Sequence, residues 1–172
     1  MKRTSPFILT VVAAVAIIVA GCIQSSHQTT AGKRNLTGAW RAQIHFSSGA
    51  FAEVKDLEFM YVFNDGGTMT ESSNYDASPP VPPAYGIWKQ VNDSSFVARY
   101  EFYLTKPPST FQHLSGGMVW LPDGRGVLTD SIVVAPDGKS FKSSVHLETY
   151  NQTGVKVTGG DEATGVGIRM EI

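Results

Sequence analysis

The sequence is short of several things that would point to particular classes of protein. Its 172 residues include one cysteine, so no disulfide framework can form within the chain. Charged residues are few and nearly balanced, with 14 basic and 15 acidic side chains and no basic stripe. A protein that binds nucleic acid would need such a stripe to neutralise phosphates. We therefore expect no nucleic-acid partner.

Two further absences concern secondary structure. No stretch of ordinary helix length carries apolar residues at a spacing of three to four. The longest apolar run, from Phe7 to Ala20, is shorter than the about 20 residues of a membrane-spanning helix, and no basic stop-transfer cluster follows it. Because Lys2 and Arg3 precede this run, residues 1–21 are predicted to be a helical export signal that is removed before the domain folds.

The single cysteine stands at the end of this signal. The residues Val19-Ala20-Gly21-Cys22 resemble the lipobox of bacterial lipoproteins, which reads aliphatic, small, glycine, cysteine. The resemblance implies cleavage between Gly21 and Cys22 by signal peptidase II, a diacylglyceryl group on the Cys22 thiol and acylation of the new amine. Two or three acyl chains anchor a protein stably in a membrane, whereas one is marginal. The alternatives are a plain secretory signal with an incidental cysteine and an uncleaved anchor.

The predicted lipidation also indicates a location. In a Gram-negative host, the absence of Asp after Cys22 resembles the default pattern for sorting to the outer membrane. We expect a lipid-anchored protein of the cell envelope, on the periplasmic face of the outer membrane if the host is Gram-negative. Residues 22–35 are polar and aperiodic, which predicts a flexible tether between the lipid and a domain at 36–172.

Within this domain the dominant period is two, which is typical of half-buried strands. Strands are predicted over 36–46, 57–63, 68–75, 85–91, 96–105, 118–121, 126–135, 140–150 and 155–172, the last broken near 159–161. Turn sequences separate them, among them Asn64-Asp65-Gly66-Gly67 and Pro122-Asp123-Gly124. In 96–105 the alternation places Arg99 and Glu101 together on the outward face.

This pattern predicts an all-β fold of about eight antiparallel strands. A meander of this length has an edge-strand problem, and closure into an up-and-down barrel removes the edges. Eight strands leave an interior that is either filled by side chains or holds one small ligand. A β-sandwich is the alternative architecture.

Three residues carry a resemblance to a family of barrels. Gly38 and Trp40 form a Gly-x-Trp motif in the first strand, and Arg169 lies in the last strand. This combination resembles lipocalins and the wider calycin group, in which the tryptophan closes one end of the barrel and the arginine packs across it. The resemblance implies structural roles for all three residues. The second lipocalin motif is matched only in part, by 129–131, and an allene-oxide-cyclase-like or dirigent-like barrel is also compatible.

A ligand site in such a barrel is expected at the open mouth and in the upper interior. The aromatic candidates are Phe59, Tyr61, Tyr85, Trp88, Tyr100, Phe102 and Tyr103, and the predicted ligand-binding set is Tyr61, Tyr85, Trp88, Tyr100 and Phe102. Two long irregular segments, 76–83 and 106–117, are predicted to form a rim around the mouth. Packing in the core is the alternative role for each aromatic residue.

The sequence predicts no catalytic residue, cofactor or metal site. His45, His113 and His146 lie on different segments without metal-ligand spacing. The acidic residues in glycine-containing turns, Asp65, Asp123 and Asp137, are explained by turn chemistry.

We therefore interpret the chain as a lipid-anchored, extracytoplasmic barrel that binds a small apolar ligand or an envelope partner. One alternative is a filled barrel acting as a structural or interaction module. The other is an enzyme of cyclase or isomerase type, which titratable groups around an open cavity would favour.

Overall fold

The computed structural model describes residues 34–76, 81–108, 110, 120–157 and 159–172. The predicted signal, the lipobox with Cys22 and all but the last two residues of the tether lie outside the described residues. The described part is all-β, without a helix. Its strands are β1 (Gly38–Phe46), β2 (Glu58–Phe63), β3 (Thr68–Ser73), β4 (Ala84–Gln90), β5 (Ser95–Lys106), β6 (Leu121–Val134), β7 (Ser140–Tyr150) and β8 (Asp161–Arg169).

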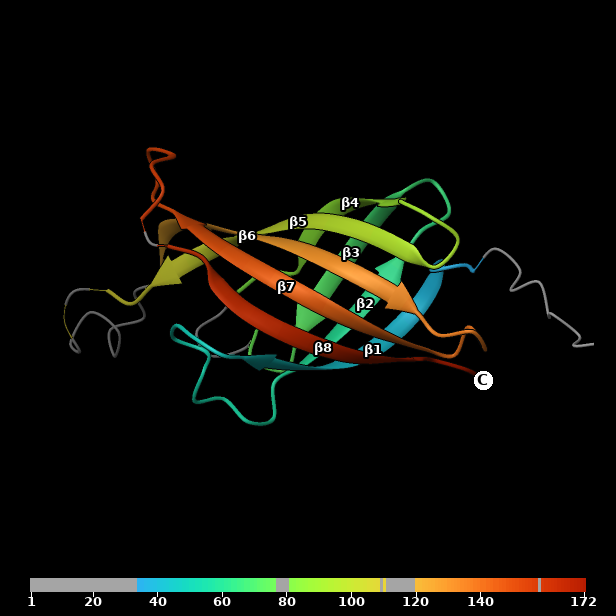
Figure 1. Ribbon diagram of the computed structural model, residues 1–172. Coiled ribbons are helices and arrows are strands. Elements are labelled where there is room, and N and C mark those ends of the chain that lie inside the picture. Colours follow the sequence, from blue (N-terminus) through green and yellow to red (C-terminus); the bar gives the residue numbers. More distant parts are fainter. Residues whose placement is uncertain (1–33, 77–80, 109, 111–119, 158) are drawn as a thin grey trace, which may run out of the picture. The chain divides into compact units, whose positions relative to one another are not determined.

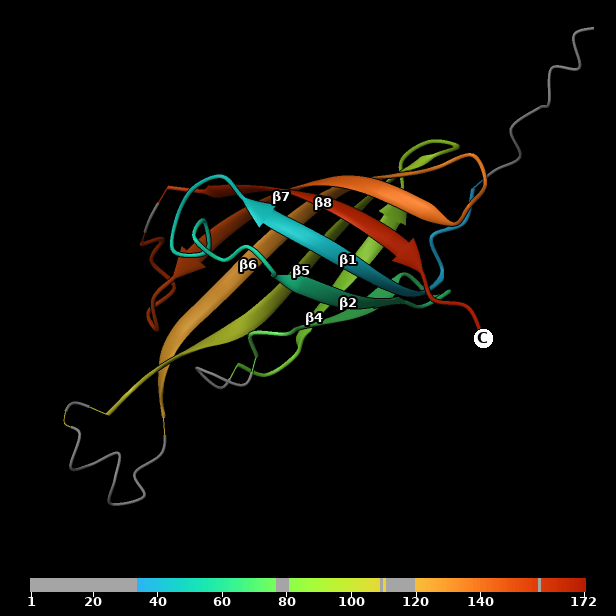
Figure 2. The ribbon, with the colours of Figure 1, turned by 90° about the horizontal axis from the view of Figure 1, so that it is seen from below.

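The eight strands form one closed barrel (Figures 1 and 2). Each strand pairs antiparallel with the next, and β8 pairs with β1 from Trp40↔Arg169 to Phe46↔Ala163. The predicted up-and-down barrel is confirmed, and the sandwich alternative is wrong. Closure leaves no unpaired edge strand, which is the physical reason a meander of this length takes this form.

Two predicted strand boundaries are wrong. The sequence Pro122-Asp123-Gly124 does not form a turn but lies within the continuous strand β6. It pairs with the end of β5 across a register shift between Leu104 and Thr105, and Gly124 adopts a φ of +124° there. Proline and glycine are tolerated at such an irregularity, because the ladder is already interrupted. The predicted break near 159–161 is confirmed, since β8 begins at Asp161 and the described residues before it make a single bridge, Tyr150↔Lys156, but β8 ends at Arg169, before the predicted end at Ile172.

Alternation along the strands places one set of side chains inside the barrel. Rings dominate the interior toward the end where β1 starts: Trp40 contacts Phe141 with ring centroids 5.1 Å apart, and Trp88 contacts Phe63 at 6.0 Å and Phe96 at 5.8 Å. These contacts fill that part of the barrel with aromatic carbon. The connections β1–β2, β3–β4, β5–β6 and β7–β8 lie at the opposite end.

Gly86 in β4 allows a close approach of two strands. A Cβ atom built on Gly86 would lie 2.2 Å from the carbonyl oxygen of Arg99 and 2.5 Å from Cβ of Tyr100, both on β5. The backbone of β5 thus occupies the space that a side chain at Gly86 would need. This close approach explains the second Gly-x-Trp sequence, at 86–88, as a packing requirement.

Gly86→Ala is expected to lower the free energy of unfolding by about 1–3 kcal/mol, because the strands must separate to admit the methyl group. Urea denaturation monitored by circular dichroism measures this change. Gly66→Ala is the matched control, since a Cβ there meets nothing within 4 Å. Equal denaturation midpoints for the two variants would contradict the prediction.

Candidate functional site

A buried pair of tyrosine hydroxyls lies in the middle of the barrel. The phenol oxygens of Tyr61 on β2 and Tyr100 on β5 are 3.1 Å apart, within hydrogen-bonding distance, and both side chains are fully buried. Tyr61 also contacts Phe59 on one side and Phe63 on the other. The pair therefore lies between the ring-filled end of the interior and the end that carries the β1–β2, β3–β4, β5–β6 and β7–β8 connections.

Asp130 places a carboxyl group beside these hydroxyls. It lies on β6, is completely buried, and neither carboxyl oxygen has a hydrogen-bond partner. Burial raises the pKa of Asp130 to about 7, and the neighbouring Ser143 and Tyr61 hydroxyls offset only part of this rise. Burial, together with the Asp130 carboxyl, in turn raises the pKa of Tyr61 and of Tyr100 well above the usual value for a phenol.

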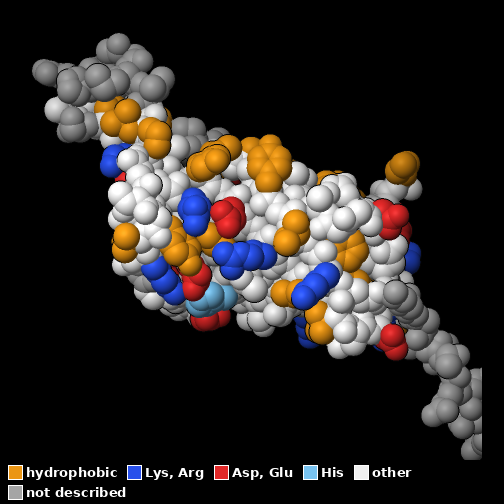
Figure 3. All heavy atoms as spheres, turned by 90° about the horizontal axis from the view of Figure 1, so that it is seen from above, with side chains coloured by type: hydrophobic (Ala, Val, Ile, Leu, Met, Phe, Trp, Pro, Cys, Tyr) orange, Lys and Arg blue, Asp and Glu red, His pale blue; other side chains and the backbone are white. Residues whose placement is uncertain are grey.

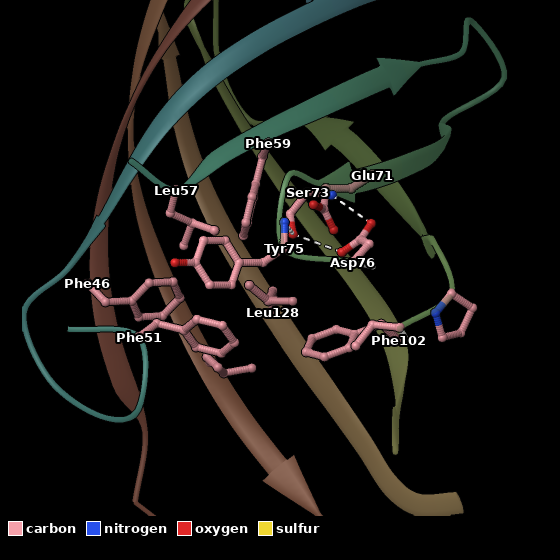
Figure 4. A pocket seen from close by; sticks show the side chains of 13 residues that line it. Phe46, Phe51, Leu57, Phe59, Glu71, Ser73, Tyr75, Asp76, Phe102 and Leu128 are labelled. Atoms are coloured by element: carbon pink, nitrogen blue, oxygen red, sulfur yellow. Dashed lines mark hydrogen bonds between the residues drawn. The ribbon is translucent and has the colours of Figure 1, made fainter. Parts of the chain in front are cut away.

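Tyr61, Tyr100 and Asp130 are together called the polar group below. A pocket of about 80 Å³ opens on the side of this polar group that faces away from the ring-filled end (Figure 4). Nine of its thirteen lining residues are apolar. The lining residues are Phe46, Phe51, Leu57, Phe59, Glu71, Ser73, Tyr75, Asp76, Val81, Pro82, Phe102, Leu128 and Leu147. Liquid water occupies about 30 Å³ per molecule, so the pocket has room for a small group or for one end of a longer molecule.

Glu71 is the acidic group at the inner side of this pocket. It lies on β3, where it pairs with Tyr61 on β2 and Ala84 on β4. Its side chain is 6% exposed, and its Oε1 atom has no hydrogen-bond partner. Burial, and secondarily the negative charge of Asp76, raises the pKa of Glu71 to about 8. The carboxyl is therefore mostly protonated at neutral pH.

Asp76 reaches the same pocket from the connection after β3, but it is already held. Its two carboxyl oxygens accept hydrogen bonds from the backbone N–H of Ser73 at 2.7 Å and from the Ser73 hydroxyl at 2.8 Å (Figure 4). Of the two pocket carboxyls, Glu71 is thus the one with an unpartnered oxygen.

The predicted ligand-binding residues separate into different environments. Phe102 lines the pocket, as does Phe59 from the wider aromatic set. Tyr61 and Tyr100 lie deeper, in the polar group below it. Trp88 faces the aromatic end, and its Nε1 donates to the backbone carbonyl of Asn64 at 3.0 Å.

Tyr85 does not belong to an interior site, and its assignment is corrected. It is 64% exposed, because Ala84, Gly86 and Trp88 take the inward positions of β4 and the period of two turns Tyr85 outward. Tyr103 is turned outward on β5 for the same reason.

The three residues that resemble the calycin motif meet at the ring-filled end of the barrel, where β1 starts, which is called the closed end below. The guanidinium carbon of Arg169 lies 4.1 Å from the centroid of the Trp40 ring, and the Trp40 Nε1 donates to the carbonyl of Leu36 at 2.8 Å. Arg169 donates three further hydrogen bonds to the backbone carbonyls of Gly138, Thr37 and Asn35 at 2.8, 2.6 and 2.6 Å. Gly38 makes room, since a Cβ there would lie 2.9 Å from the Arg169 Nη1.

Sequence reasoning missed the two buried carboxyls. The signal was present in the alternation: Glu71 shares its face of β3 with the buried Met69, and Asp130 shares its face of β6 with Leu128 and Ile132. An acidic residue in register with buried neighbours is the pattern that would have found both groups.

The outer surface carries mixed charges with apolar side chains among them (Figure 3). The predicted outward pair is confirmed, because Arg99 and Glu101 are both exposed and 3.8 Å apart, and Arg125 adds a second ion pair to Glu101 at 3.4 Å. His146 lies on the outside too, 2.6 Å from Glu162, whereas His45 faces solvent on β1. The contacts of Glu101 with Arg99 and Arg125 are exposed ion pairs of the kind found on most protein surfaces.

Several other expectations concern segments that are described only in part. His113 and residues 77–80, 109 and 111–117 of the two predicted rim segments lie outside the described residues. Across the described ranges, no three His, Cys, Asp or Glu side chains are grouped as a metal site would require. The same ranges contain no helix long and apolar enough to cross a membrane. In comparisons with known proteins, neither a protein-family model nor a curated protein sequence matches this chain.

Proposed function

We propose that this barrel binds a small, largely apolar ligand in the pocket between β1, β2, β3, β5, β6 and β7. The observation that carries the proposal is the pocket itself, an apolar recess of about 80 Å³ at the end of a barrel whose other end is packed with rings. Apolar concave sites with a few convergent polar groups are the usual form of small-ligand sites. The lining rings of Phe59 and Phe102 supply apolar contact, and Glu71 supplies a polar one.

We further propose that the protein works at the cell envelope, anchored by lipid on Cys22. The support is the resemblance of residues 19–22 to a lipobox and the basic, then apolar, signal before it. Mass spectrometry of the protein purified from its host tests this directly. A mature N-terminus at Cys22 carrying acyl mass supports the anchor, and an unmodified thiol contradicts it.

Binding is tested by titrating benzene and then n-butylbenzene into the full-length chain, with the methyl groups of its leucines labelled for NMR. The methyl signals of Leu57, Leu128 and Leu147 are expected to shift and saturate, because all three line the pocket. Leu128→Phe should abolish the shifts, since the added ring fills the pocket.

The matched control is Val133→Phe, a similar enlargement on the outward face of the same strand, where Val133 is half exposed. This variant should bind the probes like the wild type. Unchanged methyl signals up to the solubility limit of benzene would contradict ligand binding and favour the filled structural module.

One observation favours an enzyme as the second candidate. Glu71 is a buried carboxyl in the pocket, and its pKa of about 8 suits a general acid near neutral pH. An isomerase or cyclase also needs a group that stabilises developing charge, and no Lys, Arg or His lines the pocket among the described residues. Binding is therefore the function that the geometry supports best.

A further inference from the structure

We propose that the pocket selects a primary alkylammonium ion, which enters head first and donates an N–H hydrogen bond to Glu71. This inference rests on the proposed ligand-binding function and names the chemical class of the ligand. It begins from the unpartnered Oε1 of Glu71, which is a hydrogen-bond acceptor at the inner side of an apolar pocket. A buried acceptor without a donor is costly, so a ligand that supplies the donor gains binding free energy there.

The acidic groups inside the barrel, which have no basic partner, favour a cation over a neutral or anionic ligand. Asp76 lies in the pocket with Glu71, and Asp130 lies in the polar group next to it. The buried side chains of the described residues include no Lys, Arg or His to balance these carboxyls. An anion would find no cationic partner and would oppose ionisation of these carboxyls, whereas an ammonium ion would stabilise the carboxylate form of Glu71.

The rings around the pocket favour an organic cation over a metal ion. Five of the thirteen lining residues are aromatic, namely Phe46, Phe51, Phe59, Tyr75 and Phe102. Aromatic rings attract ammonium groups through their quadrupole and also solvate a hydrocarbon stem. Calcium, by contrast, needs six to eight oxygen ligands. The pocket carboxyls are those of Glu71 and Asp76, and Asp76 is already engaged by Ser73.

The position of Glu71 gives the ligand its direction. Glu71 pairs with Tyr61 and borders the buried hydroxyls, whereas Phe51 and Tyr75 reach the pocket from the connections after β1 and β3. Figure 4 shows Glu71 and Phe59 on their strands and Phe51 on the β1–β2 connection. The ammonium head therefore lies inward against Glu71, and the apolar stem points toward the mouth.

Binding of this kind must move a proton. Before binding, Glu71 is mostly protonated at pH 7, because its pKa is about 8. The titratable groups that face it are Asp76 and the phenols of Tyr61 and Tyr100, none of which is basic. An arriving ammonium ion stabilises the ionised carboxylate, so Glu71 releases its proton to solvent while the ligand keeps its own.

The experiment compares three probes of the same stem length on the full-length chain at pH 7: hexylamine, hexan-1-ol and trimethylhexylammonium. Affinities are taken from methyl NMR titrations. Hexylamine is expected to bind about tenfold or more tighter than hexan-1-ol, because its hydrogen bond to Glu71 is charge-assisted. Trimethylhexylammonium has the charge but no N–H donor, and it should bind more weakly than hexylamine.

Two variants locate the effect. Glu71→Gln should remove the advantage of hexylamine and leave hexan-1-ol binding within about twofold, since the amide has the same shape without the charge. Glu101→Gln, on the exposed face of β5, should behave like the wild type. The ratio of the hexylamine affinity to the hexan-1-ol affinity is compared between variants. Any partitioning of the probes into detergent is the same for each variant and therefore cancels.

Calorimetry of hexylamine binding in phosphate and in Tris buffer measures the number of protons released per bound ligand. This measurement uses the wild-type protein and needs no variant. Release of close to one proton per ligand at pH 7, vanishing by pH 9, supports the proposal. Equal affinities for hexylamine and hexan-1-ol without proton release overturn it while the proposed function stands. Equal affinities for the two cations overturn the N–H donation. Binding of none of the probes overturns the proposed function and this inference together.

Discussion

The free energy of unfolding of the unliganded barrel is expected to fall as the pH rises from about 4 to 8, and Asp130→Asn should remove about half of that fall. Asp130 has a pKa of about 7 in the folded chain and an ordinary value of 3.8 when exposed. Between these values the unfolded chain ionises while the folded chain holds its proton. The unfolded state therefore binds fewer protons, and stability decreases with pH.

The size of this effect follows from the shift in pKa. Between its pKa in the unfolded chain and its higher pKa in the folded chain, a buried carboxyl lowers the free energy of unfolding by about 1.4 kcal/mol for each unit that the pH rises. Asp130 therefore accounts for a loss on the order of 4 kcal/mol between pH 4 and 7, and Glu71 for a similar loss between about 4.5 and 8. As far as these two groups decide it, the domain should be most stable below about pH 3.5, where both are mostly protonated in the folded and unfolded states.

Urea denaturation of the wild type, Asp130→Asn and Glu71→Gln from pH 4 to pH 8 measures these slopes. Each variant should match the wild type near pH 4 and exceed it at pH 7, since the amide never ionises. Glu101→Gln is the control, because Glu101 is exposed and its replacement should leave the slope unchanged. A stability that rises with pH in the wild type would contradict the assignment of two neutral buried carboxyls.

Trp40→Ala is expected to lower the free energy of unfolding by about 3–5 kcal/mol, the second large effect. Trp40 is fully buried, contacts Phe141 and is covered by the Arg169 guanidinium. Its removal leaves a cavity at the closed end and takes away the ring on which Arg169 rests. The loss is comparable to a large part of the stability of an ordinary domain.

Arg169→Lys should cost less, about 1–3 kcal/mol, because lysine keeps the charge but cannot bond the carbonyls of Asn35, Thr37 and Gly138 together. Urea denaturation ranks these variants against Ile168→Ala, whose side chain is mostly exposed on the same strand. If Trp40→Ala unfolded within 1 kcal/mol of the wild type, the closed end would not stabilise the barrel.

The strands were predictable because each one alternates strongly. In β5, five inward positions from Phe96 to Leu104 are apolar, and Arg99 and Glu101 lie between them. The strand β6 was harder, because Pro122 and Gly124 are turn-forming residues by themselves. Their pairing with β5 overrode that local preference, as the shift at Leu104 and Thr105 shows.

The candidate site was only partly predictable. Phe102 was expected from its aromatic character, but the same reasoning selected Tyr85, which points to solvent. Glu71 was passed over because a sequence of Thr, Glu and Ser resembles an exposed strand, although its register with Met69 and Tyr61 places it inside. Composition alone could not distinguish these cases, since the inward or outward direction of each residue depends on register.

The sequence by itself determined the approximate number of strands, their antiparallel order and the alternation that closes them into a barrel. These properties are local, because they depend on the period of apolar residues and on turn chemistry. Only the tertiary structure decided which inward residues meet. Glu71 and Phe102 come from strands separated by β4 in the barrel, and burial by distant neighbours raises the pKa of Glu71. The pocket and its unpartnered carboxyl therefore arise from closure of the barrel, since burial and charge depend on all the surrounding strands together.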